Sequence, residues 1–370
     1  MDERQRVFDR KDRLECAWSA IRARDLLTPV KQTYRTYGLT LESDLPVTGL
    51  HSLSLHAPSP DIRLFFAAIP TWAAEALLLP ITAVRVRPSA LLPGDGTFTV
   101  SEFAGRRFFQ LTYSDGTRFL MDYAATRIWG QPGPKLSYDD LCIYLLGPVM
   151  GFVLRQRGTV TLHASSLSFH GRAVAVVGEA GAGKSTTAAA LALRGWPVLG
   201  EDVCALADSG GHYQVLPAYP RVCLWPDSVD FLFSSRDALP LMVAGWEKRF
   251  LSLDGSRAQF ASSPAPLAAI FLLDERSDLD STPSVRPISQ RESLLRLVQN
   301  TYMNWYLDRR QRAEEFDVLT RLIASTECFQ VIPSSDPARL GALAELIESH
   351  TLRLADPRGN AALGAASNHV

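Results

Sequence analysis

A glycine-rich stretch near the middle of the chain carries the residues with the clearest chemistry. Residues 178–185 read GEAGAGKS and match the phosphate-loop pattern G-x-x-x-x-G-K-[ST] without a gap. Its glycines let backbone N–H groups converge on phosphate oxygens where a Cβ would clash, and a helix that starts here adds partial positive charge. The predicted nucleotide-binding residues are Gly178, Glu179, Ala180, Gly181, Ala182, Gly183, Lys184, Ser185 and Thr186.

Two side chains of this loop have separate expected roles. Lys184 should reach the β- and γ-phosphates, and the Ser185 hydroxyl should bind Mg²⁺. The apolar run at 173–177 predicts a strand before the loop, residues 186–194 predict a helix after it, and Gly195 follows where a helix C-cap belongs. The stretch therefore predicts a site for nucleotide phosphates.

Two adjacent carboxylates follow the loop. Residues 196–200 predict a short strand that ends in Glu201 and Asp202. One helix and a returning strand bring the chain back to the phosphate end of the loop. The pair can divide the work, because one carboxylate can hold Mg²⁺, directly or through water, while the other takes a proton from an attacking hydroxyl.

The strand before the loop has an unusual predicted partner. Residues 162–169 are strand-like, and His170-Gly171 supplies a two-residue turn into the strand at 173–177. This pairs the loop strand with its predecessor in the antiparallel sense. Nucleotide-switch proteins reach the same loop through parallel crossover units instead.

Together these residues resemble the catalytic domain of the HPr kinase/phosphorylase family. More narrowly, they resemble the HPr-kinase-related proteins of bacterial gene clusters, which include kinases of lasso-peptide precursors. The similarity covers about residues 161–206, and a weaker similarity extends to residues 216–229 and 265–275. It implies an α/β (α+β) fold whose P-loop kinase domain has an antiparallel-rich sheet, as in phosphoenolpyruvate carboxykinase. It also implies transfer of the ATP γ-phosphate to a serine hydroxyl of a protein or peptide, and it allows a homo-oligomer.

The resemblance further implies roles for individual residues. Glu201 and Asp202 stand where the family has two aspartates, the first of which is the proton acceptor. Because Glu201 is one methylene longer, the base role can shift to Asp202. His163 stands where the family has a histidine near the transferred phosphate, and a hydrogen-bonded core histidine is the alternative. The predicted catalytic residues are Asp202, Glu201, Lys184 and His163, and the predicted metal ligands are Ser185 and Asp202.

Some features of the family or of phosphate sites are weaker here. The family's second Gly- and Arg-containing loop is not found, so we expect kinase activity without efficient dephosphorylation. Lys248-Arg249 could clamp a transferring phosphate, with a surface charge pair as the alternative. Asp274-Glu275 follows an apolar strand in the manner of a Walker B carboxylate, but Glu201-Asp202 is better placed for Mg²⁺.

The bulk composition limits the partners. A chain of 370 residues with 46% hydrophobic residues, 21% charged residues and a net charge of −1 is globular, and it has no charge excess to attract nucleic acid or an anionic membrane. The apolar run at 141–154 is too short to span a bilayer and predicts a buried helix broken near Gly147-Pro148. The charged N-terminus is unlike a signal peptide, and the scattered cysteines predict reduced thiols, so we expect a cytoplasmic protein.

Composition shifts along the chain predict its domains. They are a polar segment at 1–27, a β-rich α+β domain at 28–136, the P-loop catalytic domain at 137–352 and a disordered tail at 353–370. Within them we expect a hairpin at 107–124 around Asp115-Gly116, a helical region at 290–324 with an apolar and aromatic core stripe, and a last helix at 337–352.

The leading hypothesis is a kinase that uses ATP and Mg²⁺ to phosphorylate a Ser or Thr hydroxyl in a peptide or small protein. Two alternatives stay open from the sequence. One is a kinase of the same fold that acts on a small-molecule hydroxyl. The other is a non-catalytic regulatory protein that binds nucleotide and carries Glu201 as a degenerate base.

Overall fold

The computed structural model describes residues 31–53, 59–88, 96–243, 246–276 and 282–355. Contacts divide the chain into two compact units. Unit 1 comprises Met1–Arg35 and Leu39–Cys142, and unit 2 comprises Thr36–Gly38 and Ile143–Val370. The predicted domain bounds stay predictions; the segment 1–27, and the tail beyond residue 355, lie outside the described residues.

Unit 1 is built on one eight-stranded sheet in the order β1-β2-β3-β8-β7-β6-β5-β4. Its elements are β1 (Gln32–Thr36), β2 (Leu39–Ser43), β3 (Ile62–Phe65), α2 (Thr71–Ala76), β4 (Ile81–Pro88), β5 (Thr97–Phe103), β6 (Phe108–Tyr113), β7 (Arg118–Asp122) and β8 (Arg127–Gln131). The pairs β2–β3 and β3–β8 are parallel, and the pairings from β4 to β8 are antiparallel. Trp129 and Leu120 on the sheet pack with Ala73 of α2 to form a core.

The predicted hairpin of unit 1 is present. Strand β6 alternates half-buried and buried residues, as expected of a strand with one face on a core. The turn into β7 uses Gly116 at φ 93°, a left-handed conformation that suits glycine. The Asp115 carboxylate accepts a hydrogen bond of 2.8 Å from the Thr117 backbone N–H and closes the turn.

The sheets of unit 2 are mixed and rich in antiparallel pairs. The strands are β9 (Thr161–Phe169), β10 (Arg172–Val177), β11 (Val198–Gly200), β12 (Val203–Asp208), β13 (Tyr213–Leu216), β16 (Ala265–Leu273), β17 (Ser284–Pro287) and β18 (Glu327–Ile332), with a separate ribbon of β14 (Arg221–Leu224) and β15 (Arg249–Ser252). As predicted, β10 pairs with β9 in the antiparallel sense through the His170-Gly171 turn. On its other edge β10 pairs in parallel with β16, so the loop strand has one neighbour of each kind.

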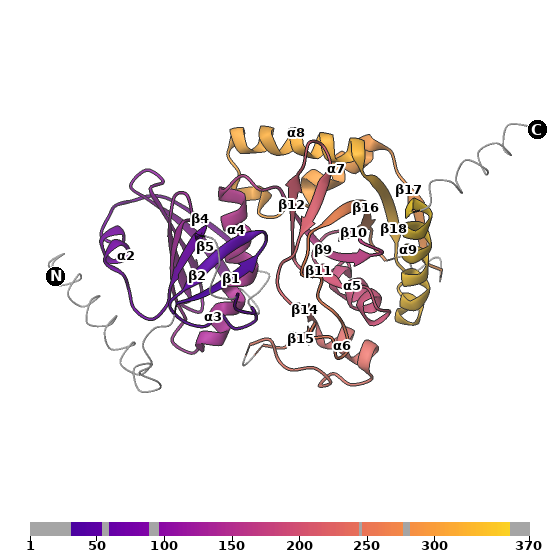
Figure 1. Ribbon diagram of the computed structural model, residues 1–370, viewed down its shortest axis with the longest axis horizontal. Coiled ribbons are helices and arrows are strands. Elements are labelled where there is room, and N and C mark those ends of the chain that lie inside the picture. The colour runs from indigo at the N-terminus through magenta and orange to yellow at the C-terminus, as the bar shows by residue number, and fades with distance from the viewer. Residues whose placement is uncertain (1–30, 54–58, 89–95, 244–245, 277–281, 356–370) are drawn as a thin grey trace, which may run out of the picture. The chain divides into compact units, whose positions relative to one another are not determined.

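Helices cover two faces of this sheet. In chain order, the helices after β8 are α3 (Tyr138–Tyr144), which begins in unit 1, and then α4 (Met150–Gln156), α5 (Lys184–Leu193), α6 (Pro226–Phe233), α7 (Gln290–Gln299), α8 (Arg309–Ser325) and α9 (Leu340–Ala355) of unit 2, with short 3₁₀ turns η2 (Asn304–Tyr306) and η3 (Pro337–Arg339). Buried residues of α5 and α9 share one core cluster, and those of α7 and α8 share another. Figure 1 shows these two helix pairs on different sides of the sheet.

The apolar segment at 141–154 differs from its prediction. We expected a break near Gly147-Pro148, but α3 runs through a π-helical turn, η1 (Leu145–Val149), directly into α4. A π-turn accommodates the proline without ending the helix, because its hydrogen bonds skip one further residue. No helix among the described residues is both long and apolar enough to cross a membrane.

The predicted helical region at 290–324 is interrupted. Helix α7 ends at Asn300, Met303 adopts a left-handed conformation at φ 51°, and α8 begins behind a capping box in which Asp308 and Gln311 exchange hydrogen bonds. The expected core stripe is correspondingly uneven: Tyr306 is buried, whereas Leu295 is 61% exposed. The capping box at Asp308 therefore starts a new helix where the spacing of apolar residues had predicted one continuous helix.

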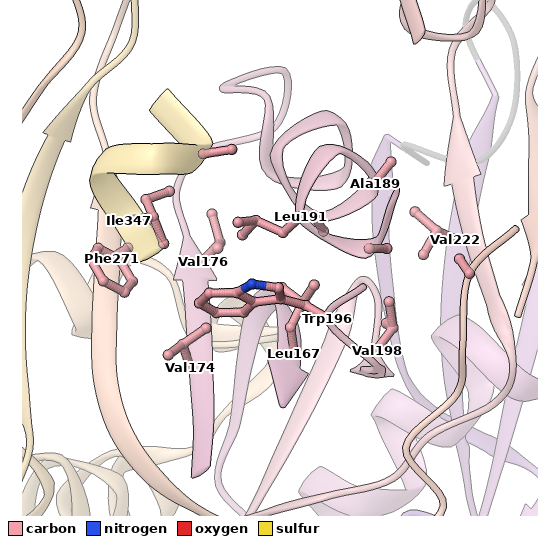
Figure 2. Close-up of a cluster of buried hydrophobic side chains, with 14 of the residues drawn as sticks. Leu167, Val174, Val176, Ala189, Leu191, Trp196, Val198, Val222, Phe271 and Ile347 are labelled. Atoms are coloured by element: carbon pink, nitrogen blue, oxygen red, sulfur yellow. The ribbon is translucent and has the colours of Figure 1, made fainter. Parts of the chain in front are cut away.

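Trp196 anchors the core beneath the phosphate-loop helix. It is fully buried, and its ring stacks on Phe169 with 4.0 Å between ring centroids. In Figure 2 the indole lies between Leu191 of α5 and the strand residues Leu167 and Val174. Packing around one large ring thus ties α5 to the β9–β10 hairpin that precedes the loop.

Candidate nucleotide-phosphate site

The loop between β10 and α5 has the backbone that a phosphate cradle requires. Gly181 and Gly183 have φ angles of 84° and 104°, and Gly183 directly precedes the first residue of α5. A side chain would be strained at both positions. A Cβ on Gly178 would lie 3.1 Å from the Cβ and carbonyl oxygen of Leu273, so the loop also packs closely on the end of β16. The helix begins at Lys184, two residues before its predicted start.

Lys184 is folded back onto the loop. Its Nζ donates hydrogen bonds of 2.7 Å to the Gly178 carbonyl and 2.8 Å to the Glu179 carbonyl. Burial lowers the pKa of this amine, and the charges of Asp202 and Glu201 oppose that effect. A buried cation whose hydrogen bonds go to neutral carbonyl oxygens is suited to a phosphate anion, which would replace them with bonds between opposite charges.

Other loop residues form hydrogen bonds within the loop and with α6. The Ala182 N–H donates to the Glu179 carbonyl at 3.2 Å, and Thr186 Oγ1 lies 2.8 Å from the Ser228 hydroxyl oxygen. Arg276 adds positive charge nearby: its Nη2 lies 3.8 Å from the position that a Cβ on Gly183 would take. A cation beside the positive end of a helix is favourable only when an anion joins them.

Ser185 connects the loop to the carboxylate pair. Its Oγ donates a hydrogen bond of 2.6 Å to Oε1 of Glu201, which follows β11 and is 7% exposed. Strand β11 pairs with β9 rather than with β10. The returning strand therefore reaches the phosphate end from across β9, and Glu201 is the carboxylate beside the predicted Mg²⁺ ligand Ser185.

Asp202 faces His163 instead. The His163 Nδ1 lies 3.2 Å from Oδ1 of Asp202 and 3.1 Å from the Asp202 carbonyl oxygen. Asp202 has a left-handed backbone at φ 67°, which is uncommon outside glycine and often marks functional sites. The turn at Asp202 directs the two neighbouring carboxylates to different partners.

The two carboxyl groups have opposite titration behaviour. Burial, together with the charge of Asp202, raises the pKa of Glu201 above its ordinary value. Burial also acts to raise the pKa of Asp202, but the hydrogen bond and charge of His163, with the charges of nearby lysines, lower it to about 2. Environments that shift the pKa values of two adjacent carboxyl groups in opposite directions are typical of acid–base sites.

Two residues of the site were missed from the sequence. Tyr302 was expected only as part of the core stripe, yet its hydroxyl donates to Oδ2 of Asp202 at 3.4 Å. Asn300 accepts a hydrogen bond of 2.8 Å from the His163 backbone N–H through its carbonyl oxygen. Both lie where α7 ends and the helical period breaks, and no sequence signal connects them with residues 163 and 202.

Asp274, the Walker B-like candidate, already has partners. It directly follows β16, whose end packs on the loop at Gly178, so its position suits a metal-site carboxylate. Its Oδ1 forms an ion pair with Arg296 of α7, and its Oδ2 accepts a hydrogen bond from the Gln330 amide. These contacts neutralise Asp274 and leave Glu201 and Asp202 as the better placed pair.

The residues around Ser185 fit Mg²⁺. Magnesium prefers hard oxygen ligands and, beside phosphates, takes only one or two carboxylates from the protein. The hydroxyl of Ser185 and the carboxylate of Glu201 supply such oxygens within 2.6 Å of each other. In the part of the chain that the structure describes, no cluster of three or more His, Cys, Asp or Glu residues could hold a metal by itself.

Among solved structures, this chain is similar to the Hpr(Ser) kinase/phosphatase from Coxiella burnetii. The two chains are 16% identical, with 53% of this chain and 99% of the other chain covered and a TM-score of 0.31. No protein-family model matches the sequence. No curated protein matches it.

Proposed function

We propose that this protein is an HPr-kinase-like kinase that uses ATP and Mg²⁺ to phosphorylate a Ser or Thr hydroxyl of a peptide or small protein. The observation that carries the proposal is the hydrogen bond from Ser185 to Glu201. It joins a glycine-rich phosphate loop to a carboxylate pair, which is what phosphoryl transfer to a hydroxyl requires and what phosphate binding alone does not.

The loop and the helix start bind and orient the phosphates. The N–H groups of the loop and Lys184 would hold the β- and γ-phosphates, in place of the loop carbonyls that Lys184 contacts. Ser185 and Glu201 would hold Mg²⁺, which supplies charge neutralisation on the phosphates when it is bound. We assign Glu201 to the metal, in place of the predicted Asp202, because Ser185 contacts Glu201.

Asp202 is the proposed proton acceptor. The acceptor hydroxyl gives its proton to the Asp202 carboxylate, its oxygen bonds to the γ-phosphorus, and the bond from that phosphorus to the bridging oxygen of ADP breaks. His163 and Tyr302 contact the two carboxylate oxygens of Asp202 and fix its direction. Because the transition state is loose, orientation of the hydroxyl matters more than the basicity of the carboxylate.

A transfer assay tests the proposal. The purified full chain would be incubated with γ-labelled ATP and Mg²⁺ and with one of three acceptors: a Ser/Thr peptide library, free serine as a small hydroxyl compound, or buffer. Label on peptides is the expected result. Label only on the small compound would select the small-molecule kinase.

A matched variant separates catalysis from regulation. Asp202→Asn keeps the size of the side chain, but it replaces one of the two contacted oxygens by an NH2 donor and cannot take the proton. We expect it to bind ATP and to transfer no label. Nucleotide binding without any transfer by the natural chain, with any acceptor, would favour the regulatory protein.

A further inference from the structure

Lys248 and Trp225 lie opposite each other at one end of the β14–β15 ribbon. The last paired residues of the ribbon are Leu224 and Arg249, so the antiparallel register places Trp225 beside Lys248. The Lys248 Nζ lies 4.9 Å from the centroid of the Trp225 ring, within the range of a cation–π interaction. Trp225 is 52% exposed, and Lys248 is half-buried.

This end of the ribbon adjoins the phosphate-loop helix. Strand β14 packs against α5. Trp225 caps α6, and Ser228 in the first turn of α6 contacts Thr186, two residues after Lys184. Lys248 and Trp225 therefore lie at the end of the ribbon from which α6 reaches Thr186 in α5, on an element that the phosphate-loop motif does not include.

The Lys248 ammonium group lies within electrostatic reach of the candidate site. Its charge interacts with the charges of Lys184, Glu201 and Asp202. Lys248 is therefore close to all three groups.

The neighbouring arginine behaves differently. Arg249 forms an ion pair with Asp237 and donates a hydrogen bond of 2.7 Å to the Leu239 carbonyl. No ion pair joins Lys248 to any carboxylate of the described residues. A cation held by a ring can bind an anion without first breaking an ion pair.

We propose that Lys248 is a second phosphate-binding cation of this site, held by Trp225 and directed to the terminal phosphate of a nucleoside triphosphate. The inference rests on the proposed function, in which the terminal phosphate lies between the loop and the carboxylates. An ammonium group there offsets the repulsion between that phosphate and the two carboxylates, and it stabilises the charge that spreads over the phosphate oxygens during transfer.

Calorimetry with two nucleotides tests this assignment. We would measure the dissociation constants of Mg²⁺·AMP-PNP and Mg²⁺·ADP for the full chain and for Lys248→Met. Loss of one charge-assisted contact to the terminal phosphate should weaken AMP-PNP binding about tenfold and leave ADP binding within about twofold. Trp225→Leu removes only the ring, so it should weaken AMP-PNP binding by a smaller factor, about threefold, and leave ADP binding unchanged.

The control is a similar cation–π pair elsewhere in unit 2. Arg257 lies 5.4 Å from the centroid of the Phe233 ring, and Arg257→Met should change neither constant. Equal weakening of both nucleotides by Lys248→Met, or no weakening of either, would overturn the assignment. Lys248→Arg keeps the positive charge, so it should bind both nucleotides as the natural chain does. If the natural chain binds neither nucleotide, the proposed function fails instead.

Discussion

Ser185 Oγ and Glu201 Oε1 are 2.6 Å apart, joined by a hydrogen bond between the first turn of α5 and the residue after β11. The contact links the phosphate loop and the start of α5 to the carboxylate that follows β11. It gives the buried Glu201 carboxylate a hydrogen-bond donor beside a second carboxylate.

Glu201→Gln should stabilise the protein at neutral pH while removing activity. The folded-state pKa of Glu201 is raised, so the folding free energy from this group is most favourable below the unfolded pKa of about 4.3 and is lost as pH rises through the folded pKa. Glutamine carries no charge to desolvate and still accepts the hydrogen bond from Ser185. We expect a Tm a few degrees above that of the natural chain at pH 7, and a smaller gap at pH 4, by calorimetry. An equal gap at both pH values would contradict burial of the charge as the cause.

Lys184→Ala should abolish phosphoryl transfer and leave the fold intact. The Lys184 ammonium group donates hydrogen bonds to the loop carbonyls of Gly178 and Glu179 and belongs to neither buried hydrophobic cluster of unit 2, so its loss should leave the core unchanged. We expect transfer to fall by at least about 100-fold with an unchanged far-UV circular dichroism spectrum. Lys135→Ala, at an exposed position of unit 1, is the control. Retained activity would remove the loop from the mechanism.

Asp202→Ala should cost more rate than His163→Ala. If Asp202 takes the proton, its loss removes a factor of about 10²–10⁴, whereas His163 only holds the carboxylate and its loss should cost about tenfold. Single-turnover transfer rates for the two variants measure the order. The reverse order would assign the base to His163.

Gly151→Ala should lower the transfer rate by displacing Tyr302 from Asp202. A Cβ on Gly151 of α4 would lie 2.3 Å from Cε1 of Tyr302, so the ring must move and its hydroxyl must leave Asp202. We expect a severalfold lower transfer rate with a changed pH profile. Gly147→Ala, one helical turn earlier, is the matched control, because the nearest atom there is the Tyr219 hydroxyl at 3.8 Å. Equal effects of the two substitutions would point to helix damage instead.

Trp196→Ala should lower the free energy of unfolding by about 3–5 kcal/mol, the usual cost of removing a large buried ring. The ring stacks on Phe169 and lies in the middle of the core cluster under α5 (Figure 2). Urea unfolding measures the change. Phe316→Ala, at a 50% exposed position of α8, should cost no more than about 0.5 kcal/mol.

The local parts of this protein follow from short stretches of its chain. Near neighbours were enough to predict the strand before the loop, the glycine-rich turn, the hairpin at His170-Gly171 and the carboxylates after β11, because periodicity and turn preferences act over a few residues. The break after Asn300 was missed, although the capping box at Asp308 is also a local signal.

Long-range packing, by contrast, selected which of the candidate groups lie together. Through this packing, Tyr302 contacts Asp202 and Ser185 contacts Glu201. Asp274 forms an ion pair with Arg296, and Lys248 lies against the Trp225 ring. The partners in these contacts lie between 16 and 100 residues apart in the chain. Their meeting depends on strand order, on the second, parallel neighbour of β10 and on how each helix packs, and none of these is encoded in a short window of sequence.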